Sequence, residues 1–396
     1  MKVPRRRFGR TEIDVPVLTC GGMRFQQSWS DLGKEEIDSS VQENLEATIS
    51  RALDYGINHI ETARGYGTSE MQLGWVLKKY DRDKLIIQTK IHPFKNDGKV
   101  LRDIFETSLK YLNMEYVDFL SIHGINTIEH LNNSLRNGGV IDQARLLQKE
   151  GRVKFIGYST HGGEEIAIPA AESGEFDYVN LHWYYIYHPL NWSMIEASNK
   201  ADMGVFLISP NDKGGMLYNP SDLLKKMCYP ATPMQWHDCY CLLNPEIHTL
   251  SLGASKPSDF KEHVDAVCGK FDNKFINQVT GIIDTELENQ LGKLWMENWY
   301  KNIPFHTDIV GGINVQEIIR LWTFDQGLGM YDWAKMRYNL LGNASHWFAG
   351  NRVENKKQLG NIDLKGHILS KQIMKILFEA DNRYYDESKQ SRISKK

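Results

Sequence analysis

Short apolar runs alternate with longer amphipathic stretches from about residue 15 to about residue 270. Most of these runs are continuously apolar rather than alternating, as in parallel strands that are buried on both faces. The pattern predicts eight strands, which are Val17–Thr19, His59–Thr62, Leu85–Thr89, Val117–Ile122, Val153–Gly157, Tyr178–His182, Gly204–Ile208 and His248–Leu252.

The stretches between the predicted strands have helical periodicity. Apolar residues recur at every fourth position in Val41–Tyr55, so they share one face of a helix. The other predicted helices are Met71–Leu77, Ile104–Leu112, Ile141–Lys149 and Phe260–Cys268. Eight strand–helix units in about 250 residues are typical of a (β/α)8 TIM barrel, which belongs to the α/β class. A doubly wound sheet would have a GxGxxG loop after its first strand, and Gly21-Gly22 lacks that spacing.

The C-terminal part of the chain has a different pattern. Apolar residues lie at helical spacing in Leu287–Trp299, on one predicted face, and again in Ile318–Trp322, Trp333–Leu340 and Ile373–Leu377, with no strand alternation. We therefore expect residues 1–285 to form the barrel and residues 286–380 to form a helical extension. Residues 381–396 are basic and contain few apolar side chains, so we expect a mobile tail.

Composition and charge narrow the class of protein. Apolar residues make up 41% of the 396 residues, charged residues make up 24%, and the net charge is −3. Such a chain can bury a large core, and it lacks the basic excess expected of a protein that binds nucleic acid or an anionic membrane. No apolar run is long enough for a transmembrane helix, and the N-terminus has no secretory signal. The sequence leaves the oligomeric state open.

The cysteines indicate the compartment. There are five of them, irregularly spaced, which argues against a disulfide framework. We therefore expect a cytoplasmic protein in a reducing environment.

Four residues capable of proton transfer or charge stabilisation follow three successive predicted strands. Glu61, Lys90 and His123 lie at the strand ends, and Tyr66 follows Glu61 by five residues. Each of them alone is more typical of a solvated loop or of packing. The four together indicate a site, because the carboxyl ends of barrel strands form the active site in this fold.

These residue types predict a particular chemistry. A lysine cation lowers the pKa of a nearby tyrosine, a carboxylate positions that lysine, and a histidine can donate to a carbonyl oxygen. Such a group could protonate an aldehyde or ketone while a hydride arrives at its carbon. The hydride would come from a nicotinamide cofactor, because no side chain can supply one.

Six motifs, spread over about two-thirds of the chain, resemble the aldo-keto reductase family. They are Phe8–Val15, Gly21–Arg24, Gly56–Ala63, Tyr66–Glu70, Ile156–Ser159 and Leu250–Ser255. The first of them resembles the hairpin that closes the bottom of such barrels. The resemblance implies a catalytic tetrad, normally Asp, Tyr, Lys and His, at Glu61, Tyr66, Lys90 and His123. Glu61 is one methylene longer than the usual Asp, so its contact with Lys90 must be made with a shifted geometry.

The resemblance also implies positions for a nicotinamide dinucleotide. Relatives hold this cofactor at positions matching Gly22, Met23, Arg24, Ser159, Asn180, Ser209, Pro210, Asn211, Lys213, Gly214, Gly253, Ala254, Ser255, Lys256, Asp259 and Glu262. A helix beginning near Ser258 would offer free N–H groups and a positive dipole to phosphate. Asp259 would repel the 2′-phosphate of NADP(H), whereas Lys256 could attract it. NADP(H) is therefore only slightly favoured over NAD(H).

The extension resembles one found on some prokaryotic relatives. Gly312–Val315 and His346–Phe348 are the matching segments, and the relatives hold 4Fe–4S clusters in cysteine-rich runs there. This chain has no cysteine after Cys268. A cluster needs thiolate ligands, so we expect neither an iron–sulfur cluster nor another metal.

Three functions follow from these patterns. The first is an NAD(P)H-dependent oxidoreductase that reduces a small carbonyl compound, or oxidises the alcohol, with Tyr66 as general acid or base. The second is a cofactor-binding protein with a regulatory role and no catalysis. The third is a lyase or epimerase that uses the same cofactor.

Overall fold

The computed structural model describes residues 1–92, 98–188 and 190–387. The chain forms two compact units. The first, here called the barrel unit, contains Met1–Tyr187, Asn191–Asn211 and His237–Asp272. The second, here called the helical unit, contains His188–Leu190, Asp212–Trp236 and Asn273–Lys396. The helical unit thus begins before the expected boundary at residue 285, and it includes a segment from within the expected barrel.

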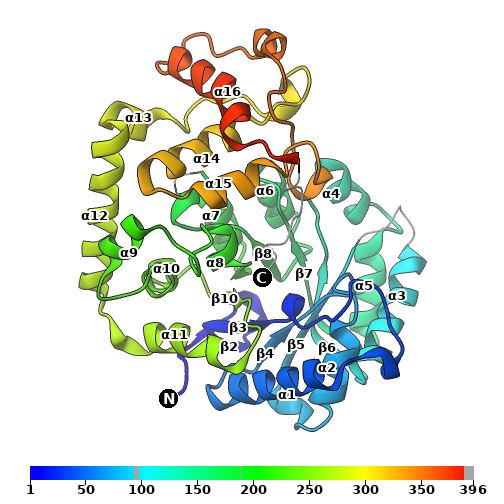
Figure 1. Ribbon diagram of the computed structural model, residues 1–396. Coiled ribbons are helices and arrows are strands. Elements are labelled where there is room, and N and C mark those ends of the chain that lie inside the picture. Colours follow the sequence, from blue (N-terminus) through cyan, green and yellow to red (C-terminus); the bar gives the residue numbers. More distant parts are fainter. Residues whose placement is uncertain (93–97, 189, 388–396) are drawn as a thin grey trace. The chain divides into compact units, whose positions relative to one another are not determined.

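Eight parallel strands close a barrel in the order β10-β3-β4-β5-β6-β7-β8-β9. Figure 1 labels several of them in the centre of the barrel unit. Their bounds are β3 Leu18–Gly21, β4 His59–Glu61, β5 Ile86–Ile91, β6 Val117–Ile122, β7 Val153–Ser159, β8 Tyr178–Leu181, β9 Gly204–Leu207 and β10 Thr249–Leu252. Nearly every strand residue is buried, as expected for strands covered on both faces. All eight predicted strands and the (β/α)8 TIM-barrel class are confirmed.

Helices follow the strands around the barrel. They are α1 Ser39–Asp54, α2 Ser69–Leu77, α3 Gly98–Leu112, α4 Ile128–Leu135, α5 Val140–Lys149, α6 Glu164–Glu172, α7 Trp192–Lys200 and α11 Phe260–Asp265. In α1 the residues Leu45, Ile49 and Ala52 are buried, so the predicted apolar stripe is the packed face. The predicted helix Phe260–Cys268 is shorter in the structure, because Gly269 has a φ of +92 in the irregular turn that follows α11.

A hairpin closes the N-terminal end of the barrel. Strands β1 Arg5–Arg7 and β2 Asp14–Pro16 pair antiparallel. Between them the ring of Phe8 is fully buried, with its centroid 5.3 Å from that of Phe119. Gly9 has a φ of +53 and lies against the backbone of β9, where a Cβ atom would clash. The apolar rings fill the bottom of the barrel and leave the opposite end for a site.

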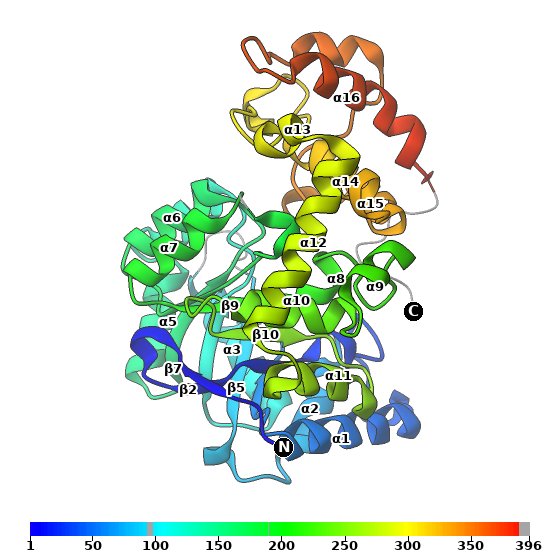
Figure 2. The same ribbon diagram turned by 90° about the vertical axis from the view of Figure 1, so that its left-hand side faces the viewer.

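The helical unit contains no β-strand among its described residues. Its helices are α9 Asp222–Cys228, α12 Asn273–Leu291, α13 Lys293–Asn298, α14 Val315–Leu328, α15 Tyr331–Tyr338 and α16 Ser370–Tyr384, while α8 Pro210–Lys213 and α10 Pro233–Leu242 cross between the units. Figure 2 shows α12 as a long yellow helix. The single helical face expected over Leu287–Trp299 is wrong, because Gly292, at a φ of +83, separates α12 from α13.

The first part of the expected tail belongs to a helix. Helix α16 continues to Tyr384, which is fully buried. Arg383 Nε and Tyr384 Oη each lie 2.6 Å from Asp325 Oδ2, so both side chains are held by the same carboxylate of α14. The prediction of a mobile tail from residue 381 is therefore wrong for residues 381–387, and the rest of it lies outside the described residues.

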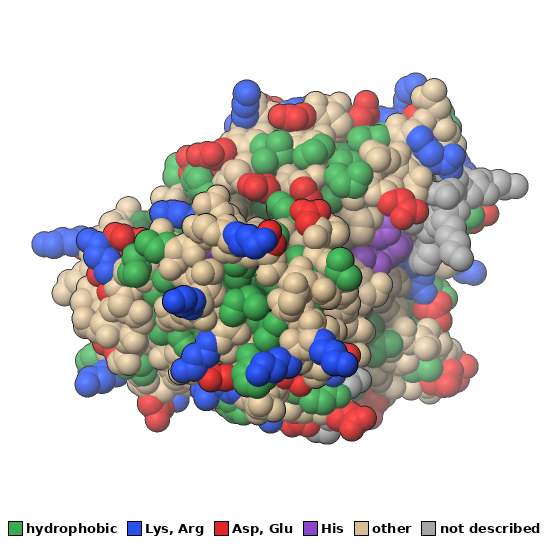
Figure 3. All heavy atoms as spheres, turned by 90° about the horizontal axis from the view of Figure 1, so that it is seen from above, with side chains coloured by type: hydrophobic (Ala, Val, Ile, Leu, Met, Phe, Trp, Pro, Cys, Tyr) green, Lys and Arg blue, Asp and Glu red, His purple; other side chains and the backbone are tan. Residues whose placement is uncertain are grey.

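The surface agrees with the small net charge. Basic and acidic side chains both occur across the face seen in Figure 3. Within the described residues, no helix is both long enough and apolar enough to cross a membrane.

Candidate active site

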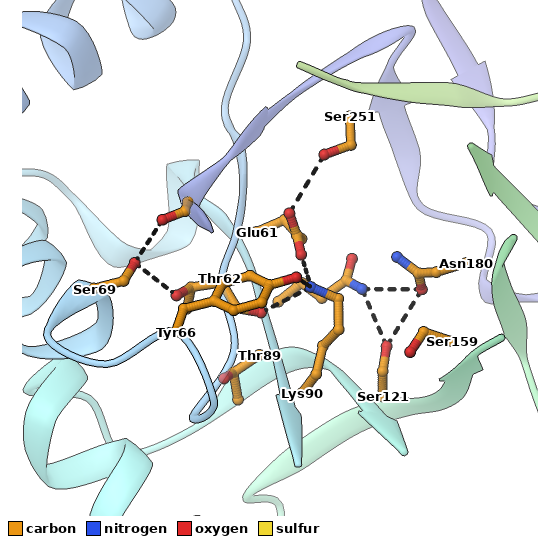
Figure 4. A network of polar contacts seen from close by, with 12 residues as sticks. Glu61, Thr62, Tyr66, Ser69, Thr89, Lys90, Ser121, Ser159, Asn180 and Ser251 are labelled. Carbon is orange, nitrogen blue, oxygen red and sulfur yellow. Dashed lines mark hydrogen bonds and ion pairs between the residues drawn. The ribbon is translucent and has the colours of Figure 1, made fainter. Parts of the chain in front are cut away.

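The structure brings the four predicted catalytic residues together at the carboxyl ends of three neighbouring strands. Glu61 is the last residue of β4, Lys90 is the penultimate residue of β5, and His123 directly follows β6. Tyr66 lies in the loop between β4 and α2, and Figure 4 shows it beside Lys90. Neighbouring parallel strands end at the same edge, which explains why residues far apart in sequence meet here.

Lys90 lies at the centre of this group. Its Nζ atom forms an ion pair with Glu61 Oε1, lies 3.3 Å from Tyr66 Oη and donates to the carbonyl oxygen of Thr62 at 3.1 Å. Glu61 is 2% exposed and Lys90 is 1% exposed. Two opposite charges buried together stabilise each other, whereas either one alone would be strongly disfavoured.

The second carboxylate oxygen of Glu61 has its own partner. Ser251 Oγ, on β10, donates to Glu61 Oε2 at 3.4 Å. Gly21 leaves room for Ser251 rather than for Glu61, since a Cβ atom at Gly21 would lie 2.7 Å from Ser251 Oγ. The extra methylene of Glu61 is therefore accommodated without loss of the contact with Lys90.

The pKa of Tyr66 shifts in the direction opposite to the expected one. The ring is partly exposed, yet burial of the hydroxyl raises its pKa above the usual value of a tyrosine. Burial disfavours the phenolate because a charge in a poorly hydrated site loses solvation. Tyr66 is therefore protonated at neutral pH, as a proton donor must be.

His123 completes the group. Its ring centroid lies 5.8 Å from that of Tyr66, with the two rings at 85°. Two further histidines follow the next strands, His161 after β7 and His182 after β8, and their ring centroids are 4.5 Å apart. The sequence reasoning missed this pair, although its position at strand ends was a usable signal.

Ser159 and Asn180 are neighbours at the ends of β7 and β8. Ser159 Oγ accepts a hydrogen bond from the backbone N–H of Gly124 at 2.9 Å. Asn180 is fully buried, and its Oδ1 accepts from Gln88 Nε2 at 3.1 Å and from Ser121 Oγ at 3.3 Å (Figure 4). Its Nδ2 atom is buried and has no hydrogen-bond partner among the described residues.

The loop that follows β3 and the loop that follows β10 also meet. Gly22, Met23 and Arg24 form a short helical turn after β3, and the Gly22 carbonyl oxygen accepts from Ser69 Oγ at 2.9 Å. A Cβ atom on Gly253, after β10, would lie 3.3 Å from the Arg24 guanidinium. These two predicted cofactor segments are therefore adjacent.

The predicted segment after β9 is divided between the two units. Ser209, Pro210 and Asn211 belong to the barrel unit, whereas Lys213 and Gly214 belong to the helical unit. Ser209 has a φ of +50, a conformation that is rare outside glycine and often found at functional sites.

The loop that precedes α11 differs from the expected phosphate site. Asp259 Oδ2 accepts hydrogen bonds from Ser255 N at 2.9 Å and from Ser255 Oγ at 3.0 Å. The N–H group of Ser255, which precedes the predicted helix start, is therefore occupied by a carboxylate, and α11 itself contains six residues. Ala254 is buried, Lys256 is exposed and Glu262 is partly exposed.

Comparison with known proteins identifies the family. The sequence model of the Aldo/keto reductase family matches residues 17–219, about half of the chain. The chain belongs to the aldo/keto reductase family. Membership confirms the resemblance seen in the sequence and makes the protein an oxidoreductase of the class that transfers hydride between NAD(P)H and a carbonyl group.

Several known proteins are similar to this chain over much of their length. A Schizosaccharomyces pombe protein named "Putative voltage-gated potassium channel subunit beta" is 26% identical over 76% of this chain and 96% of its own. The methylglyoxal reductase DkgA of Salmonella typhimurium is 29% identical over 53% of this chain and 76% of its own. The L-galactose dehydrogenase of Arabidopsis thaliana is 24% identical over 67% of this chain and 88% of its own.

Solved structures of aldo-keto reductases share the fold. The Klebsiella pneumoniae aldo-keto reductase in complex with NADPH has a TM-score of 0.57 and 16% identity, with 71% of this chain and 95% of that chain covered. The holo form of aldo-keto reductase AKR11C1 from Bacillus halodurans has a TM-score of 0.59 and 18% identity, with 71% and 96% covered.

All five cysteines are described, and all are free thiols. The described residues contain no group of three or more His, Cys, Asp or Glu side chains placed to hold a metal ion.

Proposed function

We propose that this aldo/keto reductase reduces a small aldehyde or ketone to the alcohol, or catalyses the reverse reaction, with Tyr66 as the general acid or base. The observation that supports the proposal is the buried group of Glu61, Lys90 and Tyr66, in which Lys90 contacts both of the other side chains. A tyrosine beside a buried, ion-paired lysine is suited to proton transfer with a carbonyl oxygen.

Each residue has a distinct role. A nicotinamide dinucleotide, when bound in its reduced form, supplies the hydride for the carbonyl carbon. Tyr66 donates the proton to the carbonyl oxygen, and Lys90 stabilises the phenolate that Tyr66 becomes. Glu61 is a positioning residue, because it holds the ammonium of Lys90. His123, with its ring edge against Tyr66, donates a hydrogen bond to the same oxygen.

The barrel unit fits a nicotinamide dinucleotide. The buried Nδ2 of Asn180 has no partner among the described residues and would donate to the carboxamide. Ser159 lies beside it, and Gly22–Arg24 would contact the nicotinamide ribose. The segments Ser209–Asn211 and Gly253–Lys256, with Glu262, would hold the pyrophosphate and adenosine.

NADP(H) stays slightly ahead of NAD(H) in this proposal. Lys256 is exposed and would attract a 2′-phosphate. Asp259 would repel that phosphate, but its carboxylate is held by the N–H and O–H of Ser255.

We also expect no iron–sulfur cluster, since no cysteine follows Cys268. A cytoplasmic location stays a prediction from the sequence.

The strand ends favour a small, oxygen-rich substrate. His123 lies beside Tyr66, and His161 and His182 follow the next two strands, so polar imidazole rings are found at three neighbouring strand ends. Two relatives are named for such compounds, a methylglyoxal reductase and an L-galactose dehydrogenase. We therefore propose 2-oxoaldehydes and sugars as the first substrates to try.

The test has two steps. Purified protein is titrated with NADPH and with NADH while its tryptophan fluorescence is followed, and saturable quenching is expected. NADPH or NADH oxidation is then followed with methylglyoxal and a panel of aldehydes and ketones, and NAD(P)⁺ reduction with L-galactose. Failure to bind either dinucleotide at millimolar concentration would contradict the proposal.

One observation favours a second function. The Schizosaccharomyces pombe relative is named as a channel subunit rather than as an enzyme. A regulatory protein of this kind would bind the dinucleotide without rapid turnover. Tight binding combined with no activity over the whole substrate panel would favour this alternative.

A further inference from the structure

A continuous chain of hydrogen bonds crosses the interior of the barrel below the candidate active site. Thr19 Oγ1 lies 2.8 Å from Thr249 Oγ1 and 3.1 Å from His59 Nδ1, and His59 Nε2 lies 3.1 Å from Gln88 Oε1. Gln88 Nε2 then donates to Asn180 Oδ1 at 3.1 Å. All five side chains are fully buried, so water does not compete for these bonds.

His59 lies in the middle of this chain of hydrogen bonds. Burial lowers its pKa to about 3, so the ring is neutral at physiological pH and has one N–H group. Gln88 Oε1 can only accept, so the N–H that matches it lies on His59 Nε2, and Thr19 then donates to Nδ1. The NH2 group of Gln88 lies on the other side, where Nε2 donates to Ser121 Oγ and to Asn180 Oδ1, each at 3.1 Å.

The donors that face Asn180 in this chain of hydrogen bonds decide how its amide is oriented. Gln88 Nε2 and Ser121 Oγ both donate to Asn180 Oδ1. If the Asn180 amide were turned over, its own N–H groups would point at the N–H groups of Gln88. The oxygen of Asn180 is therefore held inside the barrel, and its Nδ2 faces the remaining side without a partner among the described residues.

We propose that Gln88, which is hydrogen-bonded to His59, is a positioning residue that fixes the Asn180 amide so that its N–H groups are presented to the carboxamide oxygen of the nicotinamide. This inference rests on the proposed function. Without Gln88, the Asn180 amide can turn over and present its oxygen, which repels the carboxamide oxygen. A buried NH2 group without a partner is unfavourable, so the free protein is prepared for an acceptor at this position.

The test separates the nicotinamide from the rest of the dinucleotide. Gln88→Met replaces the amide by an apolar group of similar length. Dissociation constants are measured for NADPH and for 2′-phospho-ADP-ribose, which lacks the nicotinamide. We expect the dissociation constant of NADPH to rise about tenfold, the value of one neutral hydrogen bond, and that of 2′-phospho-ADP-ribose to stay unchanged. The kcat for carbonyl reduction should fall as well.

Gln72→Met is the matched control. Gln72 is also fully buried in the barrel unit, but it forms hydrogen bonds with Thr68 and with the backbone of Gln27 and is not part of the chain of hydrogen bonds that reaches Asn180. The control should leave the ratio of the two dissociation constants at the wild-type value. Equal weakening of both ligands by Gln88→Met, or no weakening of either, would overturn the proposal.

A second measurement uses the wild-type protein and does not depend on whether Gln88→Met folds. The thioamide analogue of NADPH has sulfur, a poorer acceptor, in place of the carboxamide oxygen. We expect the wild type to bind NADPH about tenfold more tightly than this analogue, and equal affinities would overturn the proposal. Failure of the wild type to bind NADPH or NADH at all would overturn the proposed function, and this inference with it.

Discussion

Lys90 and Glu61 form an ion pair inside the barrel, where both side chains are almost completely buried. Because removal of one member leaves a buried charge uncompensated, this pair links the stability of the fold to the site. Tyr66, 3.3 Å from Lys90, adds the chemistry to that pair. Single and double variants of these residues can therefore separate the effect on the free energy of unfolding from the effect on turnover.

Tyr66→Phe tests the proton donor. It removes the hydroxyl that we propose as the proton donor to the carbonyl oxygen and leaves the ring in place. General acid catalysis typically contributes 10²–10⁴-fold, so we expect kcat to fall by at least about 100-fold. The dissociation constant of NADPH, measured by tryptophan fluorescence, should stay within about twofold of the wild-type value.

Tyr116→Phe is the control for that experiment. Lys154 Nζ lies 4.8 Å from the ring centroid of Tyr116, the same distance as Lys90 Nζ from that of Tyr66. Tyr116 precedes β6, at the opposite end of the barrel from the site. Its variant should retain wild-type turnover. If Tyr66→Phe also retained it, Tyr66 would not be the proton donor.

Lys90→Met separates stability from catalysis. It leaves the Glu61 carboxylate buried without its cation, which we expect to lower the free energy of unfolding by about 3–5 kcal/mol. The double variant Lys90→Met/Glu61→Gln removes both charges and should recover most of that loss. Urea denaturation provides the comparison. Neither protein should turn over substrate, and measurable kcat in the stable double variant would argue against a role for Lys90.

Glu61→Asp tests the departure from the usual family residue. The shorter carboxylate keeps its charge for Lys90 but loses the 3.4 Å contact with Ser251. If Glu61 acts only by positioning Lys90, kcat should stay within about tenfold of the wild-type value. Steady-state kinetics on the best substrate provide the measurement. A collapse in Glu61→Asp would mean that the longer carboxylate has a chemical role of its own.

Asp259 is expected to influence the choice between NADPH and NADH. Asp259→Arg replaces a charge that repels the 2′-phosphate by one that attracts it, so the ratio of kcat/KM for NADPH to that for NADH should rise about tenfold or more. Asp259→Asn keeps an acceptor for Ser255 and removes the charge, so its smaller rise measures repulsion alone. An unchanged ratio in both variants would contradict this role.

His59 should make stability depend on pH. Its pKa is lowered to about 3 in the fold, whereas an unfolded histidine has a pKa of about 6.5. Below that value the unfolded chain takes up a proton that the folded chain does not, so stability falls as the pH falls from about 6.5 to about 3. His59→Phe removes this effect. When the pH is lowered from 8 to 5, the free energy of unfolding of the wild type should fall by about 2 kcal/mol relative to that of the variant.

Local sequence patterns determined the architecture of the barrel. Short apolar runs, most of them continuous, identified all eight strands, because a parallel strand buried on both faces favours apolar residues at successive positions. The strand ends then placed Glu61, Lys90 and His123 at one edge, since the direction of the chain fixes which end of each strand carries the site. These features depend on residues close together in sequence, and so they can be predicted without a structure.

Only the tertiary structure decided which distant side chains complete the site. Ser251 reaches Glu61, and Gln88 reaches Asn180, because the closed barrel brings strands together that are far apart in the chain. The direction of the Tyr66 pKa shift depends on the burial of its hydroxyl, which no local pattern reveals. Contacts and burial of this kind arise from the packing of the whole barrel, and for that reason the sequence alone did not determine them.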